Sequence, residues 1–523
     1  MLVAIGALLR LFVIFAAGPD LFSREGLPEF EEILRGIAAQ ELIDGPILPV
    51  QDYQVNAFWG GSLVVSMLAV PSFLLLGSNL VALRLIPAAL HLVSIACAFL
   101  IADRFVGRRA GWVAGLLMAL PPAGYTFVSA SVWSLHTESN TVALLMLYVY
   151  LEHRAAPGRR GLAALYGFLV GFGVYFSYEL LIPVGLIIGL ELARDRFFFL
   201  RRTFVAPAIG VLVGLLPWFR YQLLHKAPGV RVYGEPLYTH AAPTRVLSSV
   251  RDLLSLDLPQ SLWFPDSLDG AWTGRLVSAV LIGFAIAAGW MLREPIRSFF
   301  GGLLKRQPQS KVPHPVLIAL GFLALFGAAY IATRFMPGER KRPQNYRYLV
   351  PFYPFFAIAI ACVFQELKTA RVRRLVGATV GLLCAGFLTA TLVRCDVSRF
   401  GDDWDTPATS NEAFVRFIVR RYRNDHEALE YVVAQIEAKR PPEVQDELLF
   451  GLACGYRHFT GEWQKRWKRR QKARDTLAFL QERVAEPYKP YFEMREGDRL
   501  YLPGEQAAFR RDRGLPPLPH EAP

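Results

Sequence analysis

The chain has 523 residues, of which 53% are hydrophobic and only 19% are charged. A soluble domain of ordinary composition carries about a quarter of its residues as charged side chains, so the composition argues against a soluble protein. The formal net charge is +13, but the Lys and Arg residues stand in short clusters between long apolar windows. This placement is typical of membrane topology signals and argues against nucleic-acid binding.

The apolar windows predict an all-α polytopic membrane protein with about 11 transmembrane helices. Charged side chains are costly in the hydrocarbon core, so long windows without charges are transmembrane segments by default. In chain order the expected spans are 1–18, 83–103, 112–126, 139–152, 162–177, 180–193, 204–224, 274–292, 315–333, 348–365 and 375–393. The stretch around 177–183 is expected to form a bent hairpin. Segment 62–77, which Pro71 interrupts, is interpreted as a juxtamembrane or re-entrant helix.

The basic clusters fall in loops that this scheme places on one side of the membrane. They are Arg104/Arg108/Arg109, Arg154/Arg159/Arg160, Arg194/Arg196/Arg201/Arg202, Arg293/Arg297/Lys305/Arg306/Lys311 and Lys368/Arg371/Arg373/Arg374. The positive-inside rule assigns these loops to the cytoplasm. We therefore expect a multi-pass protein of the plasma (inner) membrane whose functional face and C-terminal tail are extracytoplasmic.

Three long segments remain for the extracytoplasmic side: 19–61, 225–273 and 394–523. In the first, apolar residues recur at helical spacing over 28–40, which predicts an amphipathic helix on the membrane surface. Glu31 and Glu32 are expected on the solvent-exposed face of this helix. The tail has the composition of a soluble helical domain, so the predicted domains are 1–393 and 394–523.

Four short motifs in a fixed order carry a resemblance to a known family. They are 76–87 (Leu-Gly-Ser-Asn-Leu-Val-Ala-Leu-Arg-Leu-Ile-Pro), 105–110 (Phe-Val-Gly-Arg-Arg-Ala), 217–221 (Pro-Trp-Phe-Arg-Tyr) and 347–354 (Arg-Tyr-Leu-Val-Pro-Phe-Tyr-Pro). Over about 20–396 the chain resembles the C-type membrane glycosyltransferases, such as the protein O-mannosyltransferases and the lipid A aminoarabinose transferases. These enzymes take a sugar from a polyprenyl-phosphate carrier.

The resemblance implies a site where the outer turns meet the span ends. Such chemistry needs a carboxylate that deprotonates the acceptor or holds a metal, and cations that stabilise the phosphate leaving group. Relatives usually carry an Asp just before the amphipathic helix. Here Gly26 and Leu27 occupy that position and Glu25 is adjacent, so Glu25 is the candidate catalytic acid. The alternative is a carboxylate that complements the helix dipole.

The second outer turn supplies His136 and Glu138, and Glu138 matches the family's second acid by position. Both are candidate catalytic residues. Their spacing is also compatible with binding one divalent metal ion, the one cofactor that the sequence suggests. The alternative is a helix cap with a hydrogen-bonded histidine.

Two further groups are candidates for binding the donor phosphate. Gly60 and Gly61 precede a helix and could present backbone N–H groups to an anion, although paired glycines are also common in plain turns. A basic cluster stands in one short outer loop, where phosphate or lipid head groups are its natural partners. Its members are Arg334, Arg340, Lys341, Arg342 and Arg347; the last four are the phosphate-binding candidates, and Arg347 belongs to the family motif.

The predicted function is transfer of a sugar from a polyprenyl-phosphate donor to an extracytoplasmic lipid, glycan or protein acceptor, in contact with membrane lipids. Two alternatives stay open. One is a catalytically degenerate member that acts as a lipid-binding or assembly subunit, which the shifted acid would favour. The other is a lipid or glycan transporter, which should carry paired repeats and mid-membrane charges.

Overall fold

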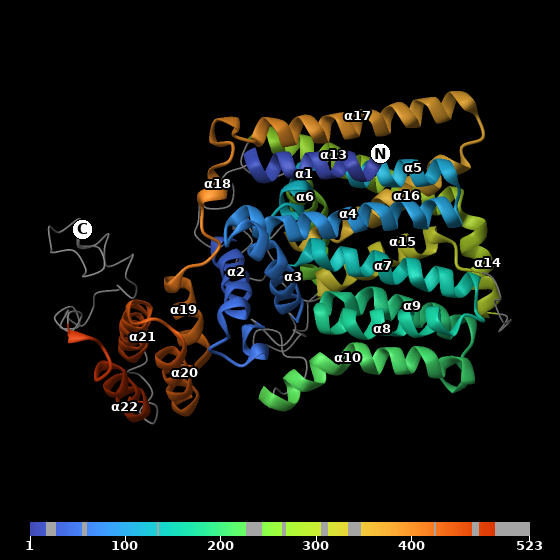
Figure 1. Ribbon diagram of the computed structural model, residues 1–523. Helices are drawn as coiled ribbons and strands as arrows, with labels where there is room; N and C mark the ends of the chain where they lie inside the picture. Colours follow the sequence, from blue (N-terminus) through green and yellow to red (C-terminus); the bar gives the residue numbers. More distant parts are fainter. Residues whose placement is uncertain are drawn as a thin grey trace.

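The computed structural model describes residues 1–16, 28–54, 60–132, 135–225, 243–263, 268–304, 312–332, 347–422, 425–462 and 470–486. Their regular structure is helical, apart from an isolated bridge between Asn79 and Pro407. The predicted all-α fold class is confirmed. Most helices lie side by side in one bundle, and the C-terminal helices gather at one end of it (Figure 1).

Each expected span coincides with a helix or a helix pair of the bundle. These are α1 (Leu2–Ala16), α4 (Leu80–Phe105), α5 (Arg108–Ala119), α6 (Ala123–Ser129), α7 (His136–Ala155), α8 (Arg160–Phe176), α9 (Leu181–Arg194), α10 (Val205–His225), α13 (Leu268–Met291), α15 (Pro315–Ala332), α16 (Phe352–Glu366) and α17 (Ala370–Arg394). Among the described residues, five helices are long and apolar enough to cross a membrane, or six if a bent pair is one span. The chain is a multi-pass membrane protein, and the count of about 11 spans stays a prediction.

The expected span 112–126 is not one straight helix, because the helix breaks within it. α5 and α6 meet at 74°, with Pro121 and Pro122 between them. Proline has no backbone N–H and clashes with the preceding helical turn. Arg10 on α1 is fully buried at this break and donates a 2.7 Å hydrogen bond from Nη1 to the Ala119 carbonyl. Its Nε donates to Ser129 Oγ at 3.2 Å. The buried arginine thus satisfies a carbonyl at the interrupted end of α5.

A tight glycine contact joins α8 to α10. Gly167 and Gly171 of α8 face Gly210 and Gly214 of α10, each pair spaced one helical turn apart. A Cβ added to Gly171 would lie 2.2 Å from the Val211 carbonyl oxygen. Small residues at this spacing let membrane helices approach backbone to backbone.

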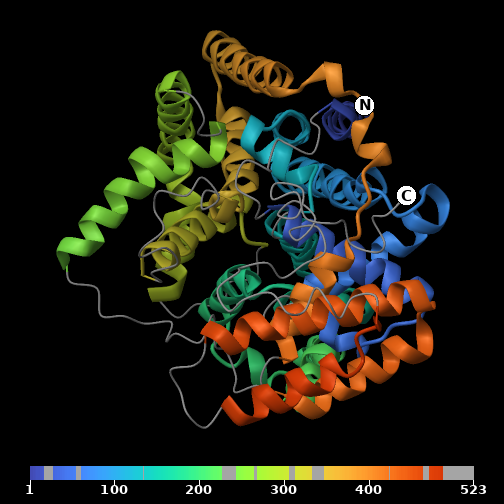
Figure 2. The same ribbon diagram turned by 90° about the vertical axis from the view of Figure 1, so that its left-hand side faces the viewer.

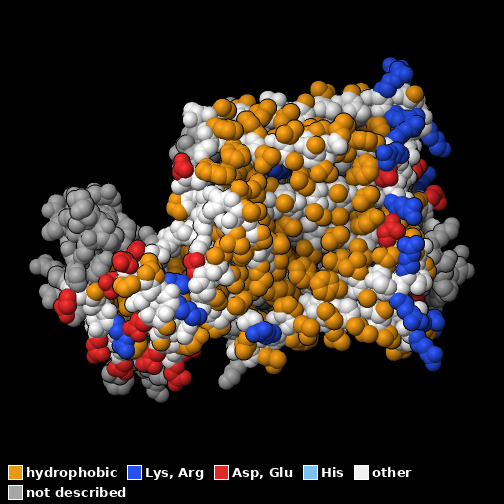
Figure 3. Space-filling view, in the orientation of Figure 1, with side chains coloured by type: hydrophobic (Ala, Val, Ile, Leu, Met, Phe, Trp, Pro, Cys, Tyr) orange, Lys and Arg blue, Asp and Glu red, His pale blue; other side chains and the backbone are white. Residues whose placement is uncertain are grey.

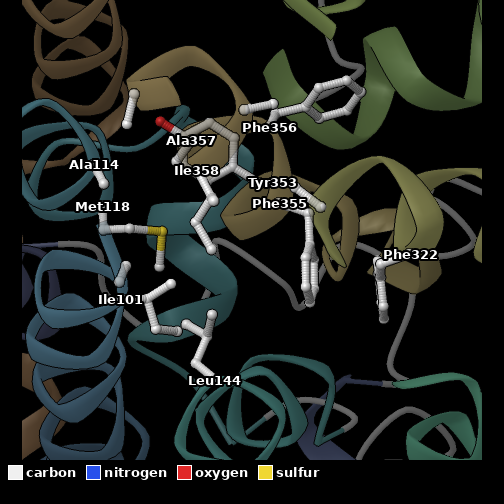
Figure 4. Packing of buried hydrophobic residues seen from close by; sticks show 14 of the residues in the cluster. Ile101, Ala114, Met118, Leu144, Phe322, Tyr353, Phe355, Phe356, Ala357 and Ile358 are labelled. Atoms are coloured by element: carbon white, nitrogen blue, oxygen red, sulfur yellow. The ribbon is translucent and has the colours of Figure 1, made fainter. Parts of the chain in front are cut away.

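Aromatic packing sets the position of α16 in the bundle. The rings of Phe322 on α15 and Phe355 on α16 stack with centroids 3.7 Å apart (Figure 4). Tyr353 donates a 2.8 Å hydrogen bond to the Leu117 carbonyl of α5. These contacts fix the N-terminal end of α16, and therefore the preceding residues Arg347 and Tyr348.

The helices α2 (Pro28–Asp44) and α3 (Gly60–Leu76) cross one end of the bundle instead of lying along it (Figure 1). This placement of α3 supports the juxtamembrane interpretation of 62–77. The hairpin expected around 177–183 is also present, as the short helix η4 (Tyr178–Leu180) between α8 and α9. Segment 225–273, which the sequence places on the extracytoplasmic side, contributes α11 (Pro243–Asp252) and α12 (Leu258–Trp263).

The tail is helical, as predicted, with α18 (Asp402–Asp405), α19 (Asn411–Tyr422), α20 (His426–Lys439), α21 (Pro442–Glu462) and α22 (Arg470–Gln481). Its apolar residues share one core with Leu34 and Ile37 of α2 and with Ile47. The apolar face of α2 is therefore covered by protein, and the expectation that α2 lies on lipid is wrong. Figure 2 shows the tail over one side of the bundle end, away from the light-green helices of 243–291.

Charged side chains tie the tail to the first outer segment. Arg421 of α19 pairs with Asp52 at 3.1 Å and donates to the Gln54 carbonyl at 3.2 Å. Arg440 pairs with Glu41 at the C-terminal end of α2. The tail and α2 thus form one packed unit.

The described basic clusters lie together at the opposite end of the bundle, where α14 (Arg293–Leu304) also lies. Lys and Arg side chains mark one rim of the molecule in Figure 3, with an apolar band beside them. This separation is the pattern that a membrane requires of its two interfaces. Which interface is cytoplasmic stays a prediction.

Candidate functional site

Charged side chains from distant parts of the chain meet at the end of the bundle away from the basic rim. They come from α2, the start of α4, the start of α7, η4 and the turn before α16. The ionisable members are Glu31, Glu32, Arg35, Arg84, His136, Glu138, Glu179 and Arg347, and the ring of Tyr348 lies between His136 and Arg347.

Glu32 and Arg84 form a buried ion pair. Arg84 donates from Nη2 to Oε2 at 3.0 Å and from Nε to Oε1 at 3.2 Å, with side chains 4% and 3% exposed for Arg84 and Glu32. Glu32 Oε1 also accepts the Val132 backbone N–H at 2.8 Å. The expectation that Glu32 lies on a solvent-exposed face is wrong, because α4 and the loop before α7 cover that side of α2.

Glu31 faces Arg347, a predicted phosphate-binding residue. Arg347 donates from Nη2 to Oε1 at 3.2 Å and from Nη1 to Oε2 at 3.4 Å. Its guanidinium also lies over the Tyr348 ring, 5.2 Å from the centroid. This pair is partly open to solvent, with side chains 11% and 21% exposed for Arg347 and Glu31. Glu31 is therefore an ion-pair partner and not simply a solvated carboxylate.

Arg35 is a buried cation between these two pairs. It donates to the Glu31 carbonyl at 3.3 Å and to the Val132 carbonyl, and its Nε has no partner among the described residues. Burial lowers the pKa of the Arg35 guanidinium, and the nearby carboxylates of Glu31, Glu138 and Glu32 partly raise it again. The positive charge of Arg347 is also close enough to repel it.

His136 is held by a carboxylate to which the sequence analysis assigned no role. Its Nδ1 lies 2.7 Å from Oε2 of Glu179 on η4, and its ring meets the Tyr348 ring edge-on at 4.8 Å. The second ring nitrogen, Nε2, is buried and has no hydrogen-bond partner in the described part of the chain. A neutral imidazole held in this way presents Nε2 as a proton acceptor when Nδ1 carries the hydrogen.

Glu138 lies in the first turn of α7, 1% exposed. Thr137 Oγ1 donates to its Oε2 at 3.0 Å, and its Oε1 is buried without a partner among the described residues. α7 begins after Leu135, whose φ of 70° is unusual for a residue with a branched side chain. This sharp entry sets both His136 and Glu138 at the helix start.

The described residues do not form a ready-made metal site. No group of three or more His, Cys, Asp and Glu side chains in these ranges is arranged to hold a metal ion. The Nδ1 atom of His136 is already engaged by Glu179. Binding of a divalent ion by His136 and Glu138 stays a prediction, and no step proposed below uses one.

Gly60 and Gly61 form the first turn of α3 and pack closely on the end of α8. A Cβ on Gly60 would lie 2.4 Å from the Tyr175 carbonyl oxygen, and one on Gly61 would lie 2.8 Å from the Phe176 ring. Close packing on the Tyr175 carbonyl is thus sufficient to require glycine at position 60, and a side chain at position 61 would have to displace the Phe176 ring. Their backbone N–H groups as a phosphate cradle stay a prediction.

Four predicted site residues lie outside the described residues: Glu25, Arg340, Lys341 and Arg342. Of the others, the structure brings His136, Glu138 and Arg347 into one cluster and adds Glu31, Arg35 and Glu179. A sequence signal existed for Arg35, which stands one helical turn after Glu31 and Glu32. Glu179 was visible as an acid at a hairpin tip, but no spacing linked it to His136.

The fold and the site define a multi-pass membrane protein with a charged cluster at one end of its helical bundle. Residues 61–220 match the family model described as dolichyl-phosphate-mannose-protein mannosyltransferase. This match confirms the resemblance to the polyprenyl-phosphate-sugar-dependent membrane glycosyltransferases that the motifs indicated. No curated protein matches the chain significantly.

Solved structures with similar folds include ArnT from Cupriavidus metallidurans bound to undecaprenyl phosphate. It has 16% sequence identity and a TM-score of 0.45, with 84% of this chain and 80% of that chain covered. The apo oligosaccharyltransferase from Archaeoglobus fulgidus has 13% identity and a TM-score of 0.40, over 84% of this chain. This chain spans 60% of the length of the Archaeoglobus enzyme.

Proposed function

We propose that the protein is an integral membrane glycosyltransferase that moves a sugar from a polyprenyl-phosphate carrier to an extracytoplasmic acceptor. The family match over 61–220 supports the reaction class. The observation that carries the proposal is the meeting of Arg347 with the His136–Glu179 pair at one end of the bundle, through the Tyr348 ring. A cation for the phosphate and a base for the acceptor are the two groups that the reaction needs.

In the proposed reaction the carrier chain lies in the bilayer and its phosphate binds Arg347. His136 Nε2 accepts the proton of an acceptor hydroxyl while that oxygen bonds to the anomeric carbon. The bond between this carbon and the phosphate oxygen breaks, and its electron pair leaves with the polyprenyl phosphate. Glu179 stabilises the protonated imidazole, and Arg347 stabilises the phosphate. Glu25 and Glu138 are the rival bases.

The site location suggests which side of the membrane the reaction uses. The cluster lies opposite the basic rim, and the positive-inside rule assigns that rim to the cytoplasm. The reaction would then occur at the extracytoplasmic face of the plasma (inner) membrane, beside the tail. Arg340, Lys341 and Arg342, with the backbone of Gly60 and Gly61, are proposed to add to the phosphate site.

The test is release of polyprenyl phosphate from a panel of labelled polyprenyl-phosphate sugars, with a membrane extract supplying acceptors. The wild-type protein should transfer label. His136→Gln should lower kcat by roughly 10²–10⁴-fold, the contribution of a general base, and Arg347→Gln should also be strongly impaired. His153→Gln is a matched control at the other end of α7, where the ring stacks on Tyr166.

Full transfer by both the His136 and Arg347 variants contradicts the proposal. Tight carrier binding without turnover in the wild type would instead identify the degenerate lipid-binding subunit. Uptake of a lipid or glycan into proteoliposomes without covalent change would identify a transporter.

A further inference from the structure

We infer that Glu31 occupies the anion site of Arg347 in the free protein, so that the donor phosphate binds by displacing this carboxylate. The same carboxylate, on returning to Arg347, would help to expel the polyprenyl phosphate product. This inference rests on the proposed function and describes how its donor site opens and empties. Glu31 would act as a placeholder for the substrate's own anion.

The first argument is the geometry of the pair. Each terminal nitrogen of Arg347 faces one oxygen of Glu31, at 3.2 and 3.4 Å. A guanidinium engages two oxygens of a phosphate through the same fork of donors. The carboxylate therefore fills the two positions that a phosphate would use.

The second argument is the charge around the pair. Arg35 donates to the Glu31 carbonyl and is close enough to Arg347 for the two guanidinium groups to repel each other. The Glu31 carboxylate attracts both cations. Removing it takes away the carboxylate that faces both terminal nitrogens of Arg347 and leaves Arg35 with the weaker attraction of Glu138 and Glu32. The Nε atom of Arg35, which is buried and unpartnered among the described residues, adds an unused donor beside them.

The third argument is the contrast with the neighbouring pair on the same helix. Glu32 is 3% exposed and is held by both Arg84 and the Val132 backbone N–H. Glu31 is 21% exposed, and within the described ranges its carboxylate is bonded to Arg347 alone. The Glu32 pair is built to stay closed. The Glu31 pair is partly open to solvent and can exchange.

Both lipid ligands offer a suitable anion to this pair of cations. The donor is a phosphodiester, whose single negative charge and two free oxygens match the fork of Arg347 as the carboxylate does, and the product is a phosphate monoester with up to two negative charges and three acceptor oxygens. Displacement of Glu31 requires only rotation about its own side-chain bonds. The displaced carboxylate would still lie beside Arg35, ready to return when the product leaves.

The test measures binding of undecaprenyl phosphate to the purified full-length chain in detergent. Glu31→Gln removes the competing charge, so its Kd should fall about five- to tenfold, since a partly shielded ion pair is worth somewhat more than an exposed one. Glu32→Gln is the matched control, one residue along α2. It should not tighten binding, when assayed at a temperature below its unfolding range. In Glu31→Gln/Arg347→Gln the gain should disappear.

Kinetics give a second readout that a structural role of Glu31 would not produce. Glu31→Gln should lower the donor KM and strengthen product inhibition by undecaprenyl phosphate, whereas a damaged site would raise KM. An unchanged or weaker Kd in a folded Glu31→Gln protein overturns the inference, as does equal tightening in the Glu32 control.

The two proposals can fail separately. If the wild type binds undecaprenyl phosphate but transfers no sugar, the proposed function fails and the comparison of Kd values still decides the role of Glu31. If neither the wild type nor Glu31→Gln binds undecaprenyl phosphate, both are overturned.

Discussion

Glu32 on α2 and Arg84 on α4 are joined by two hydrogen bonds across 52 residues of sequence, with both side chains almost fully buried. Because α2 also carries Glu31 and Arg35, this pair fixes the height and rotation of the helix that lines the candidate site. The Glu32–Arg84 pair thus holds α2 in place beside the exchangeable Glu31–Arg347 pair.

Removing one partner of the Glu32–Arg84 ion pair should destabilise the fold more than replacing both partners. Glu32→Gln leaves the Arg84 guanidinium buried without its charge partner, which should cost about 3–5 kcal/mol in the free energy of unfolding. The double variant Glu32→Leu/Arg84→Met replaces both charges by apolar groups and should recover most of that loss. Unfolding by SDS titration measures both. A single variant as stable as the double variant would refute the assignment.

The glycine contact between α8 and α10 should not tolerate side chains. Gly171→Leu places its Cβ against the Val211 carbonyl, which is part of a helix backbone and cannot rotate away, so the free energy of unfolding should drop by about 1–3 kcal/mol or more. Gly185→Leu on α9 is the matched control, because nothing lies within 4 Å of a Cβ there. Thermal unfolding in detergent should separate the two variants. Equal stability would mean that α8 and α10 are not in backbone contact.

The attachment of the tail to α2 should depend on Asp52 and Arg421. Arg421→Met removes the 3.1 Å ion pair and leaves Asp52, 7% exposed, short of a charge partner. We expect faster cleavage of the tail by a protease at a concentration that leaves the wild type intact. Glu430→Gln breaks only the exposed contact with His426 and should behave as wild type. Equal cleavage rates for both variants would count against a docked tail.

The orientation can be tested by cysteine labelling in intact cells. The starting protein has alanine in place of its five cysteines, Cys97, Cys362, Cys384, Cys395 and Cys454, all of which are free thiols in the structure. Ser398→Cys and Gly158→Cys then place single exposed thiols at opposite ends of the bundle. A membrane-impermeant maleimide should label Ser398→Cys only. Labelling of Gly158→Cys instead would invert the proposed topology.

The bundle was largely predictable, because the length of each apolar window can be compared directly with the thickness of the bilayer. The break in 112–126 was missed although Pro121 and Pro122 stand inside it. The mean hydropathy of such a window does not depend on whether a proline lacks its backbone N–H. It therefore gives no sign that the helix changes direction there.

The site was predictable only in part. His136, Glu138 and Arg347 could be placed by motif position, since each stands at the end of an expected span. The role of Glu32 could not be inferred, because its partners, Arg84 and the Val132 backbone N–H, lie far along the chain. The pairing of His136 with Glu179 depends on the meeting of two turns 43 residues apart, which no periodicity encodes.

The core shared by α2 and the tail has a consequence for synthesis. Leu34 and Ile37 find their apolar partners on α19 to α22, and the contacts of Arg421 with Asp52 and Gln54 span 369 and 367 residues. At ordinary rates of translation, the first outer helix must wait for a time on the order of tens of seconds before these partners exist. During that interval its apolar face needs a temporary cover, and the bilayer surface beside it is the nearest one. The final docking of the tail would then lift α2 from lipid onto protein as the last step of assembly.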